Sequence, residues 1–304
     1  MRKGILQDAG AFVKLMFSAF LVMVSFLVTL VGGLLLAMPV FGMGFVELIE
    51  SLSDIAHPDY ASLLKYFQII QSVGLFVIPP FILAWFFGHK IFRYLYLNRK
   101  VRWNTIALTT VLVLSAIPLI NFLAHFNAGI SLPDSLSALE EWMQRTEESA
   151  KRLTEMFLRA DTIADLMFNI FIIAVIPAVG EELLFRGIIQ RLFSEWTMSK
   201  HAGIWIAAII FSAMHLQFYG FIPRTMLGVL FGYLLVWSGR MWVPIIAHFV
   251  NNLTAVLVYY FIYKNQLSES IETIGAARED WMYTLISLLF FIFFLTVFYS
   301  REKV

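Results

Sequence analysis

The chain has 304 residues, of which 60% are hydrophobic and 14% are charged, and its mean hydropathy is +0.79. These values exclude an ordinary soluble domain and predict a polytopic membrane protein. The 22 Lys and Arg residues nearly balance the 21 Asp and Glu residues, so the net charge of +1 gives no indication of a nucleic-acid partner. The chain has no cysteine, which excludes disulfides, a thiolate nucleophile and cysteine-ligated metals.

Eight segments approach the 20 or so apolar residues that a membrane-spanning helix needs. They cover 12–38, 63–87, 104–126, 162–189, 202–217, 222–238, 242–263 and 281–299. The fifth and sixth are short and closely joined, so a re-entrant pair is the alternative to two full spans. No repeat or linker divides the chain. We therefore expect an all-α helical bundle in the lipid bilayer, with one membrane domain over 1–304 and a catalytic core over 162–263.

Basic and acidic residues alternate between the connections that join these segments. The connection after the second span is basic, and the connection before it is acidic; the residues are Lys90, Arg93, Arg99, Lys100 and Arg102, against Glu47, Glu50, Asp54 and Asp59. Because Lys and Arg concentrate on the cytoplasmic side, this alternation places both termini in the cytoplasm.

The longest connection, 127–161, has a helical pattern with an apolar face that includes Leu139, Trp142 and Phe157. We expect an amphipathic helix at the outer membrane interface. A helix that rests on the membrane or on neighbouring spans explains the pattern better than a gating role, so we assign this segment no chemistry.

Three charges interrupt the fourth apolar segment, at Glu181, Glu182 and Arg186. A charge in hydrocarbon costs roughly 2.5–3.5 kcal/mol on insertion scales, so such residues usually face the protein interior and mark sites. Glu182 and Arg186 stand four residues apart, so we expect them to pair on one helix face. Glu181 is left without a local partner. Pro177, one turn earlier, predicts a bend beside these carboxylates.

Three further polar residues lie inside later apolar segments: His215 in the fifth, and His248 with Asn252 in the seventh. His248 and Asn252 are four apart and share a helix face. Counting 1.5 Å per residue places these residues and Glu181 at comparable depths, compatible with one cavity that opens toward the cytoplasm. Each residue alone has a structural explanation as a helix-bridging group. Together they predict a site.

These side chains suit the hydrolysis of an amide bond. A carboxylate that has lost its hydration binds a proton more readily, which suits a general base for water. One imidazole can orient the water, while a second imidazole and an amide NH2 can donate to the oxyanion. The chain has no HExxH motif and no serine elbow, so zincin and serine-hydrolase sites are not supported.

The motifs EExxxR at Glu181 to Arg186, FxxxH at Phe211 to His215 and HxxxN at His248 to Asn252 occur in that order. In this order they resemble the CPBP family of intramembrane proteases, which includes type II CAAX prenyl endopeptidases and bacterial bacteriocin-processing (Abi) relatives. The resemblance implies that Glu181 and His215 activate water, that His248 and Asn252 hold the oxyanion, and that Glu182 and Arg186 support the site.

The family is also described as metalloprotease, which makes Glu181, His215 and His248 an alternative metal-binding set, with zinc as the ion. We favour a reading that needs no cofactor, because one carboxylate does not easily serve both as ligand and as base.

The resemblance implies an endopeptidase of a bacterial inner membrane that acts on a membrane-associated protein or peptide. A prenylated CAAX end and a bacterial peptide are both open as substrates, and the oligomeric state is open as well. A non-proteolytic scaffold or immunity partner of the same family is the alternative. A proton-coupled transporter is less favoured, because the polar residues cluster at one depth and no repeat is evident.

Overall fold

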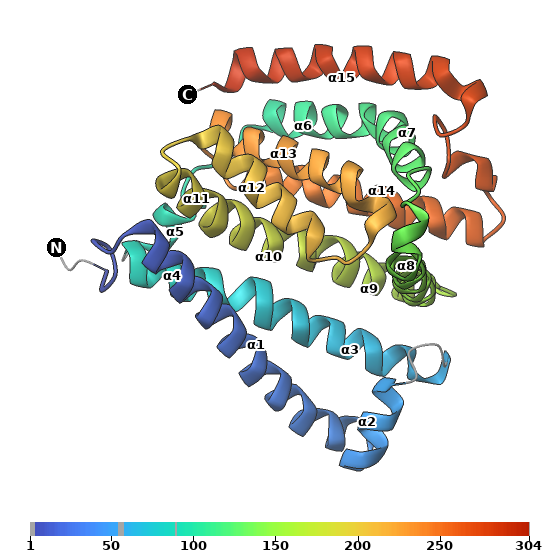
Figure 1. Cartoon of the computed structure of the whole chain (residues 1–304), viewed down its shortest axis with the longest axis horizontal. Helices are drawn as coiled ribbons and strands as arrows, with labels where there is room; N and C mark the ends of the chain where they lie inside the picture. The colour runs from blue at the N-terminus through green and yellow to red at the C-terminus, as the bar shows by residue number, and fades with distance from the viewer. Residues whose placement is uncertain (1–3, 54–57, 89, 304) are drawn as a thin grey trace.

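The computed structural model describes residues 4–53, 58–88 and 90–303, and this part of the chain is a bundle of helices without strands (Figure 1). Asp54 of the acidic connection lies outside the described residues. The predicted all-α membrane bundle is confirmed. The helices are α1 (Ala11–Phe41), α2 (Phe45–Ser53), α3 (Ala61–Ser72), α4 (Ile78–Gly88), α5 (Ile91–Tyr94), α6 (Trp103–Ser115), α7 (Ile117–Ala128), α8 (Ser137–Leu158), α9 (Ile163–Asn169), α10 (Ile176–Leu184), α11 (Gln190–Trp196), α12 (Lys200–Ala213), α13 (Phe221–Ser238), α14 (Trp242–Tyr263) and α15 (Trp281–Glu302).

In the described part of the chain, seven helical stretches are long and apolar enough to cross a membrane, one fewer than the eight expected. The difference lies at 202–217, where α12 has 14 residues. At 1.5 Å per residue this helix is about 21 Å long, short of the roughly 30 Å hydrocarbon core. It ends at Ala213 because the chain turns through Leu216, whose φ is 53°, and returns as α13. The closely joined pair noted in the sequence is therefore a hairpin with one short arm.

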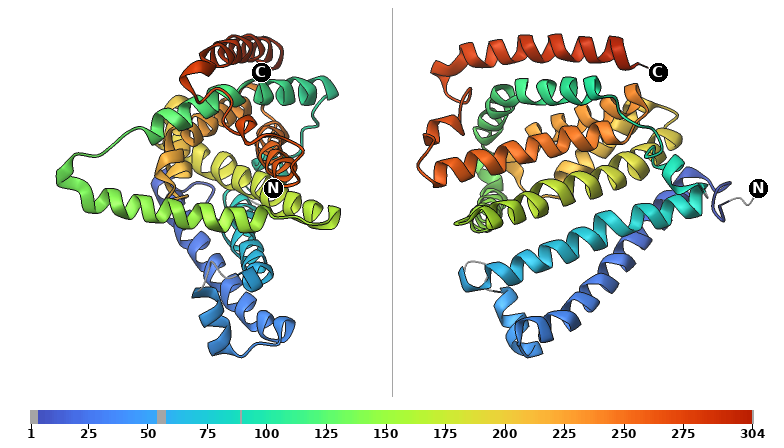
Figure 2. Two further views of the ribbon diagram at one scale, coloured as in Figure 1. Left: turned by 90° about the vertical axis from the view of Figure 1, so that its right-hand side faces the viewer. Right: turned by 180° about the vertical axis from the view of Figure 1, so that it is seen from behind.

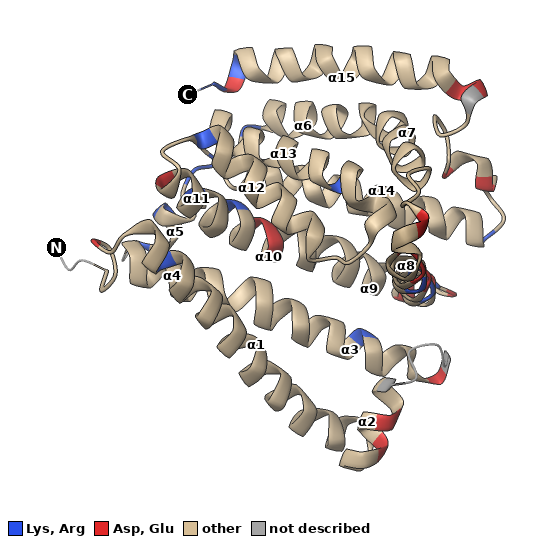
Figure 3. Cartoon of the chain, in the orientation of Figure 1, with Lys and Arg blue, Asp and Glu red and all other residues tan. Residues whose placement is uncertain are grey.

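The two described ends of the chain lie at the same end of the bundle (Figure 1). Lys and Arg predominate there, whereas Asp and Glu predominate at the opposite end (Figure 3). The alternation of basic and acidic connections seen in the sequence is thus preserved in space. It is the distribution that the positive-inside rule relates to orientation.

The predicted amphipathic helix is present as α8, over 137–158 of the expected 127–161. It runs across the acidic end of the bundle and not along the spans (Figure 2). Part of its apolar face packs on the bundle: Phe157 is buried, and the Trp142 ring lies 5.2 Å from that of Phe218, whereas Leu139 and much of Trp142 are exposed.

Two of the spans contain three π-helical turns, Val73–Val77 in one and Ile170–Val175 and Phe185–Ile189 in the other. The first two directly precede prolines, Pro79 and Pro177. Proline has no N–H to donate and its ring clashes with the preceding turn, so a widened turn accommodates it. The segments α9, α10 and α11 form one long helix, Ile163–Trp196, with a π-turn on each side of the two glutamates.

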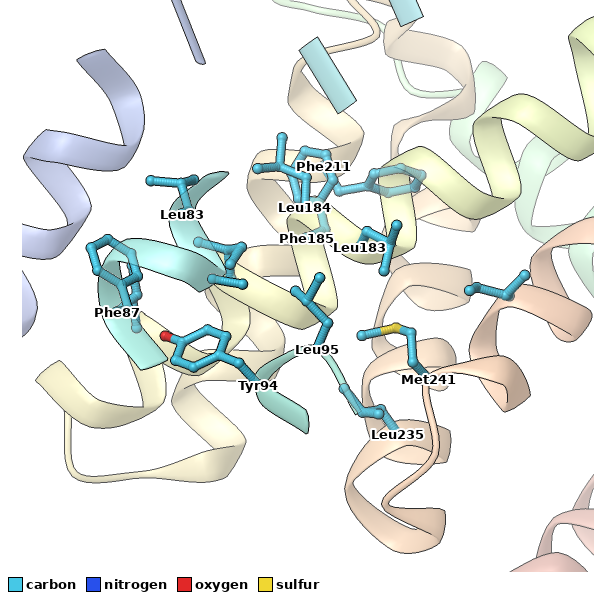
Figure 4. Close-up of a cluster of buried hydrophobic side chains, with 14 of the residues drawn as sticks. Leu83, Phe87, Tyr94, Leu95, Leu183, Leu184, Phe185, Phe211, Leu235 and Met241 are labelled. Carbon is cyan, nitrogen blue, oxygen red and sulfur yellow. The ribbon is translucent and has the colours of Figure 1, made fainter. Parts of the chain in front are cut away.

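A cluster of buried apolar side chains packs between α10 and the basic end of the bundle. It joins α4, α5, α10, α12 and α13 around side chains that include Leu95, Leu184, Phe185, Phe211 and Met241 (Figure 4). Gly228 and Gly232, which form a GxxxG in the sequence, face α12 closely: a Cβ at Gly228 would lie 3.0 Å from that of Ala208. Close approach of two helices is typical of this motif in membranes.

We expect Gly203→Ala to destabilise the protein by about 1–3 kcal/mol, because the added methyl would lie 2.7 Å from the carbonyl oxygen of Gln190 on α11. The control is Gly32→Ala in α1, where a Cβ meets no atom within 4 Å. Thermal unfolding in one detergent would show a lower Tm for the first variant alone. Equal Tm values would contradict the packing of α11 on α12.

Candidate active site

The centre of the candidate site is the side chain of Glu182, which is fully buried on α10. Its Oε2 lies 3.0 Å from Nε of Arg186, as an ion pair without the geometry of an aligned hydrogen bond. The predicted pairing of these two residues is confirmed. Arg186 Nη2 also donates to the carbonyl of Gly228 on α13, at 3.1 Å. The motif thereby joins two spans.

His248 on α14 completes this network. Its Nδ1 lies 2.9 Å from Oε1 of Glu182. With that carboxylate ionised, as its pairing with Arg186 requires, Nδ1 carries the proton and donates it. The ring stacks on Phe231, with centroids 5.4 Å apart, and meets Phe211 edge-on at 6.1 Å. Sequence reasoning assigned Glu182 to Arg186 alone and missed this contact, because it depends on how α10 and α14 face each other.

Glu181 differs from its neighbour in having no hydrogen-bond partner among the described residues. Its Oε2 lies 3.8 Å from Nε2 of His248, which is longer than a hydrogen bond. The side chain is 12% exposed, against 0% for Glu182. Two adjacent carboxylates therefore have different environments: one is held by two cations or donors, and the other is free to bind a water molecule.

His215 lies just beyond the end of α12. Its Nδ1 is 2.8 Å from the carbonyl oxygen of Phe211. A carbonyl can only accept, so the proton is on Nδ1 and a neutral ring presents a lone pair at Nε2. In the described structure no hydrogen bond or ion pair joins His215 to Glu181. The Phe211 ring lies against the rings of both His215 and His248.

Asn252 on α14 hydrogen-bonds through its side chain to the backbone of the long helix where Pro177 interrupts the regular hydrogen bonds. Its Nδ2 donates to the carbonyl of Ile173, at 3.0 Å. In a regular helix that carbonyl would accept from the N–H of residue 177, but residue 177 is proline and has none. One N–H of the Asn252 amide is therefore engaged in satisfying the bent helix, and its second N–H remains for a ligand.

Sequence reasoning missed Arg224, in the first turn of α13. Its guanidinium is close enough to Glu181 and His215 to act on both electrostatically. The signal was available, because Arg224 is a charge inside the sixth apolar segment and intramembrane charges usually mark sites. The polar neighbours of Arg224, namely Gln217 and Glu147, extend toward α8. The opening of the site toward the cytoplasm stays a prediction.

No group of three His, Asp or Glu residues in the described structure is arranged to hold a metal ion. The alternative set of Glu181, His215 and His248 thus does not come together as a ligand cage. Nδ1 of His215 bonds to a backbone carbonyl and Nδ1 of His248 to Glu182, which leaves Nε2 of each ring as the nitrogen that could meet a ligand.

Comparison with known proteins supports the same part of the chain. Residues 163–254 match the family model described as type II CAAX prenyl endopeptidase Rce1-like, and all three motifs lie inside that segment. The family resemblance is confirmed. The matched segment includes α9 to α13 and the first half of α14, which carry every residue of the candidate site.

Two proteins of Bacillus subtilis (strain 168) are similar to this chain. Uncharacterized protein YpbD is 34% identical over 86 residues, 27% of this chain and 41% of that protein. Putative membrane peptidase YdiL is 27% identical over 148 residues, 49% of this chain and 57% of that protein. The matches thus span about half the length of these relatives. No solved structure matches the chain significantly. This segment is similar in sequence to a membrane protease family.

We expect Glu182→Gln to lower stability by about 3–5 kcal/mol, since it leaves the buried Arg186 without its counter-charge. Glu181→Gln, one residue away, removes no hydrogen bond among the described residues and should unfold near the wild-type temperature. Thermal unfolding of both variants in the same detergent tests this difference. A wild-type Tm for Glu182→Gln would contradict the network described above.

Proposed function

We propose that this protein is an intramembrane endopeptidase that uses Glu181 to activate water against a peptide bond of a membrane-associated protein or peptide. The observation that carries the proposal is the contrast between two adjacent glutamates. Glu182 is fixed by Arg186 and His248, whereas Glu181 is nearly buried and has no hydrogen-bond partner in the described structure. An unpaired carboxylate at the edge of a charge network suits a general base.

In the proposed reaction, Glu181 takes a proton from water as the water oxygen attacks the substrate carbonyl carbon. His215 contributes the lone pair of Nε2, which can accept the other hydrogen of that water and orient it. The groups left to contact the substrate oxygen are the second N–H of Asn252 and Nε2 of His248, which donates to an oxyanion in the imidazolium form, where both ring nitrogens carry a proton. Glu181 then passes the proton to the leaving nitrogen as the C–N bond breaks.

No step of this mechanism needs a metal ion. If zinc or another divalent ion is nevertheless required, Glu181, His215 and His248 are the residues to hold it, and they would have to rearrange to do so. A chelator arm in the assay below decides between the two forms of the proposal.

The proposed location is a bacterial plasma membrane, with both termini and the basic connections in the cytoplasm. The substrate class follows from the position of Glu181 inside a span, which only a segment in or at the bilayer can reach. Whether that segment carries a prenylated CAAX end or is a bacterial peptide is a property of the substrate to be measured.

We expect Glu181→Gln to lower cleavage of a fluorogenic peptide library in nanodiscs by about 10²–10⁴-fold, since it removes the base while preserving shape. His215→Ala should lower it similarly. Glu50→Gln on α2, exposed and far along the chain from the site, is the matched control. Activity that survives a chelator supports the glutamate mechanism, and activity restored by Zn²⁺ assigns a metal. Equal cleavage by wild type and Glu181→Gln would reject Glu181 as the base.

The absence of native cysteine allows a clean test of orientation, because each introduced thiol is unique. We expect Glu272→Cys, between α14 and α15, to react with a membrane-impermeant maleimide in intact cells. Met198→Cys, between α11 and α12, should react only after permeabilisation. The reverse pattern would place the termini outside.

A further inference from the structure

Two hydrogen bonds set the register between the long helix and α13. Gln190 donates to the carbonyl of Gly232 at 3.3 Å, and Arg186 donates to that of Gly228 at 3.1 Å. Both helices advance by four residues from one contact to the other, so they run parallel with a constant offset. One further turn in the same direction brings Arg224 to the level of Glu182, beside Glu181.

The Arg224 guanidinium has one protein partner on its distal nitrogens. Nη2 donates to Oε1 of Gln217 at 2.7 Å, whereas Nη1 is buried and has no hydrogen-bond partner among the described residues. A guanidinium has five N–H donors in a fixed fork, and a buried donor left unsatisfied costs free energy. The protein therefore retains an unfilled, positively charged donor within electrostatic reach of Glu181 and His215.

The donors predicted for the oxyanion are largely engaged elsewhere. Asn252 gives one N–H to the carbonyl of Ile173, and His248 gives Nδ1 to Glu182. His215 gives Nδ1 to the carbonyl of Phe211. The described structure leaves two buried guanidinium nitrogens of the site without a partner, Nη1 of Arg186 and Nη1 of Arg224. Arg186 is already engaged by Glu182 and by the carbonyl of Gly228, whereas Arg224 donates to Gln217 alone among the hydrogen bonds of the described residues, so Arg224 is the more available donor.

We propose that Arg224 is a further catalytic residue, whose Nη1 donates a hydrogen bond to the substrate carbonyl oxygen as that oxygen becomes the tetrahedral oxyanion. The inference rests on the proposed peptidase function. As the water oxygen bonds to the carbonyl carbon, the C=O π pair moves onto the oxygen, and Arg224 stabilises this charge without transferring a proton. When the π bond re-forms and the C–N bond breaks, the proton that Glu181 took from water goes to the amine. Arg224 stays protonated throughout.

A purely structural role of Arg224 predicts different effects of mutation from a catalytic one. Arg224 also holds Gln217, in the turn between α12 and α13, and lies near Glu147 of α8. If its purpose is to fix that turn, Gln217→Leu should reproduce the effects of Arg224→Met on both activity and stability. If its purpose is to meet the oxyanion, removing a charge whose hydrogen bonds are incomplete should leave Tm unchanged or raise it, because functional groups are commonly retained at a cost in stability.

The test measures kcat, KM and Tm for wild type, Arg224→Met, Arg224→Lys and Gln217→Leu, using peptides with free and amidated carboxyl ends. We expect Arg224→Met to lower kcat on the order of 100-fold with little change in KM, the size seen when one oxyanion donor is lost. Arg224→Lys should recover part of this loss, and Gln217→Leu should lose less. Arg191→Met, which removes an arginine whose partners are Glu195 and Tyr94, is the charge-matched control and should keep kcat.

Three results would overturn the inference. The first is a wild-type kcat for Arg224→Met. The second is a fall in Tm that Gln217→Leu reproduces, which would show that Arg224 serves to fix the turn between α12 and α13. The third is a rise in KM confined to peptides with a free carboxyl end, which assigns Arg224 to a carboxylate of the substrate. Glu181→Gln separates the two proposals: if it is inactive while Arg224→Met is fully active, the peptidase stands and the role of Arg224 falls. Equal rates for wild type and Glu181→Gln would reject the peptidase mechanism itself, and the role of Arg224 with it.

Discussion

A fully buried carboxylate inside a membrane-spanning helix must be compensated, and the way Glu182 is compensated organises this protein. Its two oxygens face Arg186 on the same helix and His248 on α14, and Arg186 continues to a carbonyl of α13. Three helices are thereby fixed relative to one another by contacts that cannot be lost singly without leaving a buried charge. The network also leaves Glu181 without a hydrogen bond, since Arg186 and His248 are already engaged by Glu182.

The irregular backbone around the glutamates must also be compensated inside the membrane. In lipid, every backbone group must find a partner within the protein, so a proline in a span needs a compensating donor. Asn252 supplies it by donating to the carbonyl of Ile173, which Pro177 leaves free. A residue that the motif pattern marks for chemistry thus also repairs the helix that carries the base. Variants of Asn252 should be interpreted with both roles in mind.

The charged residues of the site differ in how completely their hydrogen bonds are satisfied, and the proposed chemistry depends on this difference. Glu182 and Arg186 are paired with each other and joined to α13 and α14, so they support structure, although Nη1 of Arg186 has no hydrogen-bond partner. Glu181 makes no hydrogen bond among the described residues, and Nη1 of Arg224 is also without a partner. An unpaired acceptor and an unpaired donor, both partly desolvated and near each other, match the two ends of a hydrolysis: a proton to be taken from water and a negative charge to be received on a carbonyl oxygen. Full pairing would stabilise the fold and leave nothing for a substrate.

The sequence by itself determined the membrane class, the positions of most spans, the amphipathic helix, the pairing of Glu182 with Arg186 and the family resemblance. These depend on composition and on spacings within one helix or one motif, which are local properties of the chain. Tertiary structure decided that α12 is too short to span, that His248 meets Glu182, that Asn252 donates to Ile173 and that Arg224 donates to Gln217 with a second nitrogen left unpartnered. Each of these contacts depends on the register and facing of helices distant in sequence, which no local period specifies.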